Sequence, residues 1–97
     1  MAISQIQGLV ERDGRVISGE GFRCDRIQEG TYIVHLERPF AGLPVPVCTV
    51  YGPPWATFNM SVAVVEAQPN MFVCLTSTPD RPVDCGFTFI VSGESEY

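Results

Sequence analysis

The chain has 97 residues, of which 45% are hydrophobic and 18% charged, and this length fits one domain with a single core. Its net charge is −5 and its few basic residues are arginines scattered along the chain, which disfavours binding to nucleic acid or to an anionic membrane. No apolar run reaches the roughly 20 residues of a membrane-spanning helix, and the first residues do not resemble a signal peptide. We therefore expect that the protein is made in the cytoplasm and does not insert into a membrane.

Residues 1–12 are compatible with more than one structure. Their apolar residues have the spacing of a short helical turn, but Gly8 disfavours a helix. A leading strand or an N-terminal arm that packs on a neighbour is the alternative. The Asp13-Gly14 turn then begins the main domain, predicted at 13–93, with a short strand at 15–18.

The clearest prediction is a β-hairpin, because two runs of alternating apolar and polar residues flank a turn at Gly30. Alternation with period two places one set in the core and the other in water. The set expected in the core is Phe22, Cys24, Tyr32, Val34 and Leu36. The set expected in water is Arg23, Asp25, His35 and Glu37.

The second half of the chain predicts four further strands and a polar tail at 94–97. Pro44 and Pro46 begin an extended segment that ends at Tyr51, and the two prolines indicate an edge strand or a first part that does not join the ladder. The other three strands are expected at residues 60–67, 71–76 and 85–92. A total of six or seven short strands separated by turns predicts an all-β antiparallel β-sandwich.

The last three strands are apolar on both alternating faces. A sheet with one face in water should not have this pattern, so either the monomer covers both faces of these strands or their outer face packs on another subunit. Since 97 residues can hardly supply a third covering layer, we expect a homo-oligomer. The side chains expected in the core are Phe22, Tyr32, Val34, Leu36, Phe40, Val47, Val64, Phe72, Phe87 and Phe89.

The cysteines do not have the spacing of a zinc or thioredoxin site. Without a signal peptide, reduced thiols that act as small core hydrophobes are the default. Disulfides remain an alternative, with Cys74 and Cys85 as the first pair to test.

The sequence offers little for catalysis. Any nucleophile–histidine arrangement must use His35, the only histidine, which is expected on a solvent-facing strand position. No nucleophile elbow or glycine-rich phosphate loop occurs. Asp80 and Asp84 lie in one loop but lack the dense oxygen ligands of a calcium site. We expect no enzymatic activity, no cofactor and no metal.

The loop from Tyr51 to Asn59 is the best candidate for a binding site. It presents Tyr51 and Trp55 on a Gly-Pro-Pro scaffold, and aromatic rings beside a few polar groups are typical of sugar sites. Trp55, Tyr51 and Asn59 are therefore the candidate ligand-binding residues. The alternative is that Trp55 covers one end of the sandwich or packs in a subunit contact.

Several motifs support a resemblance to a known class of domains. They are Gly21-Phe22-Arg23-Cys24, Gly30-Thr31-Tyr32-Ile33-Val34-His35-Leu36, Arg38-Pro39-Phe40, Pro44-Val45-Pro46-Val47 and the final Gly86 to Gly93 segment. Over residues 13–93 the chain resembles small β-sandwich domains of phage tail fibres and is similar to H-type lectins. The resemblance implies a six-stranded antiparallel sandwich that assembles as a trimer and binds N-acetylgalactosamine-type sugars. It also implies that the protein is part of a virion or a surface fibre. The sugar-contacting positions of the lectins have no match residue by residue, and their tryptophan near the final strand is absent.

These observations predict a non-enzymatic binding or assembly module, a trimer that engages a cell-surface glycan or a fibre protein. The alternative is a purely structural oligomeric subunit with only protein partners.

Overall fold

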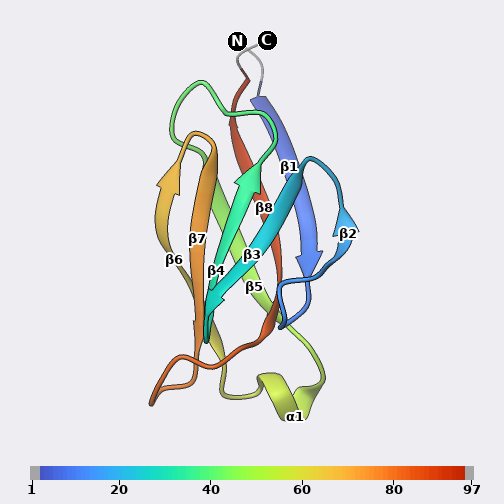
Figure 1. Ribbon diagram of the computed structural model, residues 1–97, viewed down its shortest axis with the longest axis vertical. Helices are drawn as coiled ribbons and strands as arrows, with labels where there is room; N and C mark the ends of the chain where they lie inside the picture. Colours follow the sequence, from blue (N-terminus) through green and yellow to red (C-terminus); the bar gives the residue numbers. More distant parts are fainter. Residues whose placement is uncertain (1–2, 96–97) are drawn as a thin grey trace.

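The computed structural model describes residues 3–95 and consists of two antiparallel four-stranded sheets packed face to face (Figure 1). The elements are β1 (Ile3–Val10), β2 (Val16–Gly19), β3 (Phe22–Gln28), β4 (Thr31–Leu36), β5 (Val45–Tyr51), α1 (Pro54–Thr57), β6 (Ser61–Gln68), β7 (Met71–Ser77) and β8 (Gly86–Glu94). One sheet has the order β2-β1-β8-β5 and the other β3-β4-β7-β6. The predicted antiparallel β-sandwich is confirmed, with eight strands where the sequence predicted six or seven.

The additional strand is β1, which lies inside its sheet between β2 and β8. Its glycine is needed there, because a Cβ on Gly8 would lie 2.3 Å from the Phe22 ring and 2.8 Å from the Phe89 ring. Gly8, which disfavoured a helix in the sequence, therefore lets the Phe22 and Phe89 rings pack directly on the backbone of β1. Residues 1 and 2 of the predicted arm and residues 96 and 97 of the predicted tail lie outside the described part, and Glu94 belongs to β8.

The predicted hairpin is β3 and β4, with Phe22 opposite Leu36 and Cys24 opposite Val34. Gly30 makes the turn with a φ of 76°, and the backbone there passes so close to Thr76 that only glycine fits. The two sets of side chains lie on the predicted faces: Phe22, Tyr32, Val34 and Leu36 are buried, Cys24 is half-buried, and Arg23, Asp25 and Glu37 are exposed. His35, which the sequence also placed in water, is half-buried.

The core between the sheets is a cluster of aromatic rings. Phe89 contacts Phe22 edge to face with centroids 4.8 Å apart, and it contacts Phe72 at 5.2 Å. Tyr32 and Phe87 form a second pair at 5.2 Å. Edge-to-face pairs of this kind add to the stabilisation from burial.

Two of the predicted core residues are not buried. Val47 is 63% exposed, because its partner in the ladder is Ile90 and both point out of the sandwich. Val64 is 38% exposed, because it lies on the edge strand β6, where a β-bulge between Val64 and Glu66 interrupts the pairing. The residues that complete the core instead are Val10, Cys74, Cys85 and Val91.

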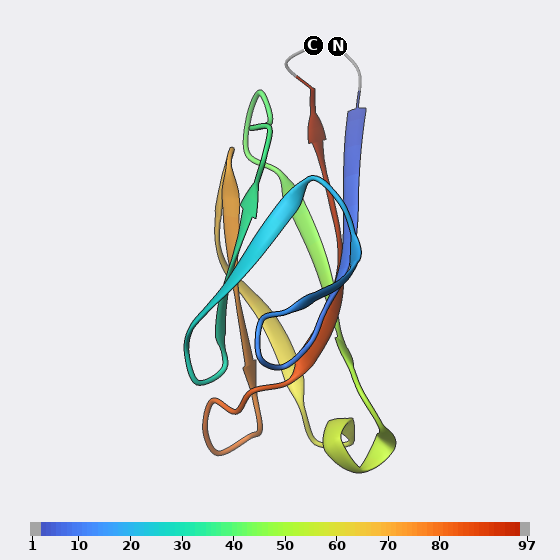
Figure 2. The same ribbon diagram turned by 45° about the vertical axis from the view of Figure 1, so that its right-hand side comes forward.

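The two ends of the sandwich differ. The start of β1 and the end of β8 lie together at one end, with Ile3 opposite Glu94. The helical turn α1 lies at the other end, with the β3–β4 turn and the loop before β8 (Figures 1 and 2). Within the described residues, no helix is long and apolar enough to cross a membrane.

Candidate functional site

The α1 end of the sandwich contains an open groove of about 670 Å³. It is lined by residues from the β1–β2 turn, the end of β5, α1 and the loop before β8. These residues are Glu11, Arg12, Tyr51, Gly52, Pro53, Trp55, Ala56, Asp84, Cys85 and Gly86. Segments that are distant in the sequence thus form one concave surface, the shape expected of a ligand site.

Trp55 is presented at this groove without being packed into the protein. Its residue surface is 79% exposed, and that of Tyr51 is 47% exposed. Pro53 is extended and Pro54 begins α1, whose single turn is closed by hydrogen bonds from the backbone N of Ala56 and the hydroxyl of Thr57 to the carbonyl of Pro53. Two adjacent prolines restrict the backbone, so the aromatic rings are held on a stiff support.

The structure brings together two of the three candidate residues. Tyr51 and Trp55 line the same groove, whereas Asn59 is exposed beyond α1 and does not line it. The charged groups of the groove are those of Glu11, Arg12 and Asp84. No local pattern points to Arg12, because it lies in a turn nearly 40 positions before Tyr51. It reaches the groove because β8 lies between β1 and β5 and pairs with both.

A hydrogen-bond network behind the groove fixes the relative positions of its walls. The Tyr32 hydroxyl donates to the carbonyl of Arg12 at 2.6 Å and accepts from the backbone N of Cys85 at 3.3 Å. Burial raises the pKa of Tyr32, so the phenol remains a neutral donor. The β1–β2 turn and the loop before β8 are therefore joined through one buried side chain.

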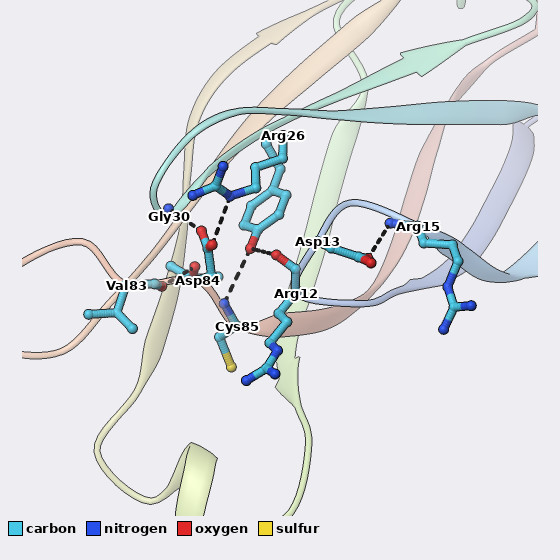
Figure 3. Close-up of polar contacts among 10 residues, drawn as sticks. Arg12, Asp13, Arg15, Arg26, Gly30, Val83, Asp84 and Cys85 are labelled. Carbon is cyan, nitrogen blue, oxygen red and sulfur yellow. Dashed lines mark hydrogen bonds and ion pairs between the residues drawn. The ribbon is translucent and has the colours of Figure 1, made fainter.

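Asp84 holds the same loop from the other side. Figure 3 shows its carboxylate between Arg26 Nε and the backbone N of Gly30, each at 2.7 Å. Burial alone would raise the pKa of Asp84, but the hydrogen bonds from Arg26 and Gly30 outweigh it and lower the pKa. Both carboxylate oxygens are thus committed to structural contacts, and Arg12 and Glu11 are the charged groups left to meet a ligand.

The only histidine lies outside the groove. His35 is on the outer face of the β3-β4-β7-β6 sheet, where its Nε2 is 3.2 Å from an oxygen of Asp25, which also pairs with Arg23 at 2.8 Å. The described residues contain no group of three or more His, Cys, Asp and Glu side chains that could hold a metal ion.

All four cysteines are free thiols, so the alternative pair Cys74 and Cys85 is not joined. Cys24 and Cys74 point between the sheets, and burial raises the pKa of Cys24 to about 12. Contact with the Cys48 thiol and burial both raise the pKa of Cys74. These thiols are neutral near pH 7 and act as small apolar core side chains.

Comparison with protein families, with curated proteins and with solved structures finds no match to this chain.

Proposed function

We propose that this protein is a non-enzymatic binding module that holds a neutral sugar in the groove at its α1 end and acts as a homo-oligomer. The observation that carries the proposal is the exposure of Trp55, 79%, beside Tyr51 at the mouth of a groove. Two aromatic rings that line one groove on a stiff proline support can both stack on a single ligand, which would bury them.

The chemistry of the groove favours a sugar. The apolar C–H face of a pyranose ring stacks on an indole or phenol ring, and a few polar groups then fix its orientation by hydrogen bonds to hydroxyls. Arg12 supplies donors and Glu11 supplies acceptors beside the two rings. The chain carries a net charge of −5, which repels acidic sugars and favours a neutral one.

The resemblance to tail-fibre domains and H-type lectins also supports a glycan ligand, and it favours a trimer. Because this chain lacks the tryptophan that those lectins have near their final strand, it would bind the sugar at a different place, in the groove around Trp55. An N-acetylgalactosamine-type sugar is the first ligand to test.

A purely structural oligomeric subunit is the second candidate function. It is favoured by the exposed apolar side chains on the outside of the sandwich, among them Val45, Val47 and Ile90. In that case Trp55 would be covered by a neighbouring protein and no sugar would bind.

The test is binding of the purified protein to an array of neutral glycans, followed by titration of each sugar that binds. Trp55→Ala should weaken binding by at least tenfold. The matched control is Phe58→Ala, because Phe58 is 81% exposed and follows α1 but does not line the groove; it should bind as the unchanged protein does.

Either of two results refutes the glycan function: no neutral glycan binds, or the two substitutions weaken binding equally. Circular dichroism of both variants shows whether the fold is retained. A Trp55→Ala protein that unfolds while its folded fraction binds normally favours the structural role.

A further inference from the structure

The outward face of the β2-β1-β8-β5 sheet is a second surface, which meets the groove at Tyr51, the last residue of β5. The ladder registers define its members in the three long strands, Ile3, Gln5, Gln7 and Leu9 in β1, Thr88, Ile90, Ser92 and Glu94 in β8, and Val45, Val47, Thr49 and Tyr51 in β5. We call this set the neutral face, because Glu94, at one end, is its one charged member. In Figure 1 these three strands lie side by side along the long axis.

The β5 side of the neutral face is mainly aliphatic and open to solvent, whereas β1 contributes Gln5 and Gln7. Val47 and Ile90 are partners in the ladder and are 63% and 44% exposed, and Val45 beside them is 65% exposed. Leu43, in the loop before β5, is 70% exposed and borders a shallow hollow shared with Ile3 and Val45. Contiguous apolar side chains of this kind mark surfaces that are covered by another molecule.

The outer face of the other sheet differs in charge and in burial. Arg23 and Asp25 form an ion pair on β3, and Glu66 lies across the same sheet on β6. The apolar residues between them, Ile33 and Val73, are already partly buried by their neighbours. The outward positions of β7, Met71, Val73 and Leu75, are also apolar, as the sequence predicted, but they are partly buried, whereas Val45 and Val47 of the neutral face are mostly exposed.

The edges of both sheets are blocked against pairing with another strand. Pro46 removes a backbone donor from β5, and β2 is only four residues long. Bulges interrupt β3 between Arg26 and Gln28 and β6 between Val64 and Glu66. Short strands, prolines and bulges all oppose edge-to-edge association, so an assembly of this protein has to use a face.

We propose that copies of this chain associate through the neutral face. A second copy is the occupant that fits the charge, because each copy carries −5 and two such chains repel unless uncharged surfaces meet. The absence of cations from these strands excludes an acidic partner by the same reasoning. This inference deepens the assembly role proposed above and rests on it, but it does not depend on the sugar.

The size of the face sets the expected strength of association. Strands about 4.8 Å apart that rise about 3.3 Å per residue give three long strands and the short β2 a flat area of about 400 Å² per copy. Two such faces in contact bury a flat area of about 800 Å² in total, without the extra surface of protruding side chains. This is below the roughly 1,200 Å² of total buried surface in stable complexes. We therefore expect weak association of the copies, with a dissociation constant in the micromolar range.

The test is sedimentation velocity of the full chain from about 1 to about 100 μM. The unchanged protein should form dimers or larger oligomers as the concentration rises. The double substitution Val47→Glu/Ile90→Glu should keep it monomeric at every concentration, because it buries four like charges in each pairwise contact. The matched control is Val65→Glu, since Val65 is 57% exposed on β6 of the other sheet; it should associate normally.

A protein that remains monomeric at the highest concentration overturns the proposal, as does a double variant that still associates or a control that dissociates equally. If the double variant does not fold by circular dichroism, Val47→Thr/Ile90→Thr keeps β-branched side chains and should weaken association by at least tenfold. Sugar titration separates the two proposals: the monomeric variant should retain the affinity of a single groove, whereas loss of sugar binding by Trp55→Ala should leave association unchanged.

Discussion

The substitution Gly8→Ala tests the central packing of the sandwich. Gly8 lies in β1 opposite Phe89, and an added Cβ would lie 2.3 Å from Phe22 Cζ, 2.6 Å from Phe22 Cε1 and 2.8 Å from Phe89 Cε1. The Phe22 ring cannot swing aside, since it is 7% exposed and packs edge to face against Phe89 at 4.8 Å. The rings or the strand must therefore shift.

Forcing an extra methyl group into a packed core costs about 1–3 kcal/mol. Alanine offsets part of that cost, because it restricts the unfolded chain by about 0.4–1 kcal/mol relative to glycine. We expect Gly8→Ala to lower the free energy of unfolding by about 1–2 kcal/mol, which for a domain of this size lowers Tm by about 4–16 °C.

The assay is urea unfolding followed by circular dichroism, performed at low protein concentration so that association does not contribute. Gly42→Ala is the control, because a Cβ there meets nothing within 4 Å; its stability should be unchanged or slightly higher. A second variant, Phe22→Leu, removes the ring that the new methyl would strike, and in its presence Gly8→Ala should cost at least 1 kcal/mol less, as in other double-mutant cycles of contacting residues. If Gly8→Ala is as stable as Gly42→Ala, the described packing of the Phe22 and Phe89 rings on the backbone of β1 is wrong.

Three further predictions concern the core, the groove support and the thiols. Phe89→Ala should destabilise the protein by about 3–5 kcal/mol in thermal unfolding, since Phe89 is 2% exposed and touches several rings; a cost below about 1 kcal/mol would contradict its central position. Asp84→Asn should lower stability at neutral pH, because the contacts with Arg26 lower the Asp84 pKa in the folded state. That contribution is present above the unfolded pKa and is lost as the pH falls through the lower folded value, so urea titrations of the two proteins should converge in acid; a pH-independent difference would contradict this reasoning. Iodoacetamide at pH 8 should modify Cys48 before Cys24, since contact with the Cys74 thiol lowers the pKa of Cys48 and burial raises that of Cys24 to about 12. Both thiols are half-buried, so peptide mapping that finds Cys24 modified first would contradict this order of thiol pKa values.

Much of the local structure could be predicted from the order of residues. The Asp13-Gly14 turn is present, with the Arg15 backbone N bonded to the Asp13 carboxylate at 2.9 Å, and the β3–β4 hairpin has the predicted faces. These features depend on contacts between near neighbours, for which turn residues and period-two alternation are sufficient signals.

The composition of the groove could be predicted only in part. Tyr51 and Trp55 belong to one short loop, so their proximity follows from the sequence. Asn59, the third candidate ligand-binding residue, does not line the groove, because nearness along the chain does not show on which side of α1 a residue lies. Arg12 and Asp84 come from distant turns that are joined through the Tyr32 hydroxyl and the Gly30 turn, and no local pattern indicates such contacts.

The sequence by itself determined the antiparallel β-sandwich class, the main hairpin and the position of β5 as an edge strand, because alternation and prolines act through each strand's own backbone. Only the tertiary structure decided that β1 lies inside a sheet and that Val47 points outward. The physical reason is that alternation assigns residues to two faces but cannot tell which face is buried when both are apolar, as in β5 and β8. That choice is made by the second sheet, which can cover only one of them.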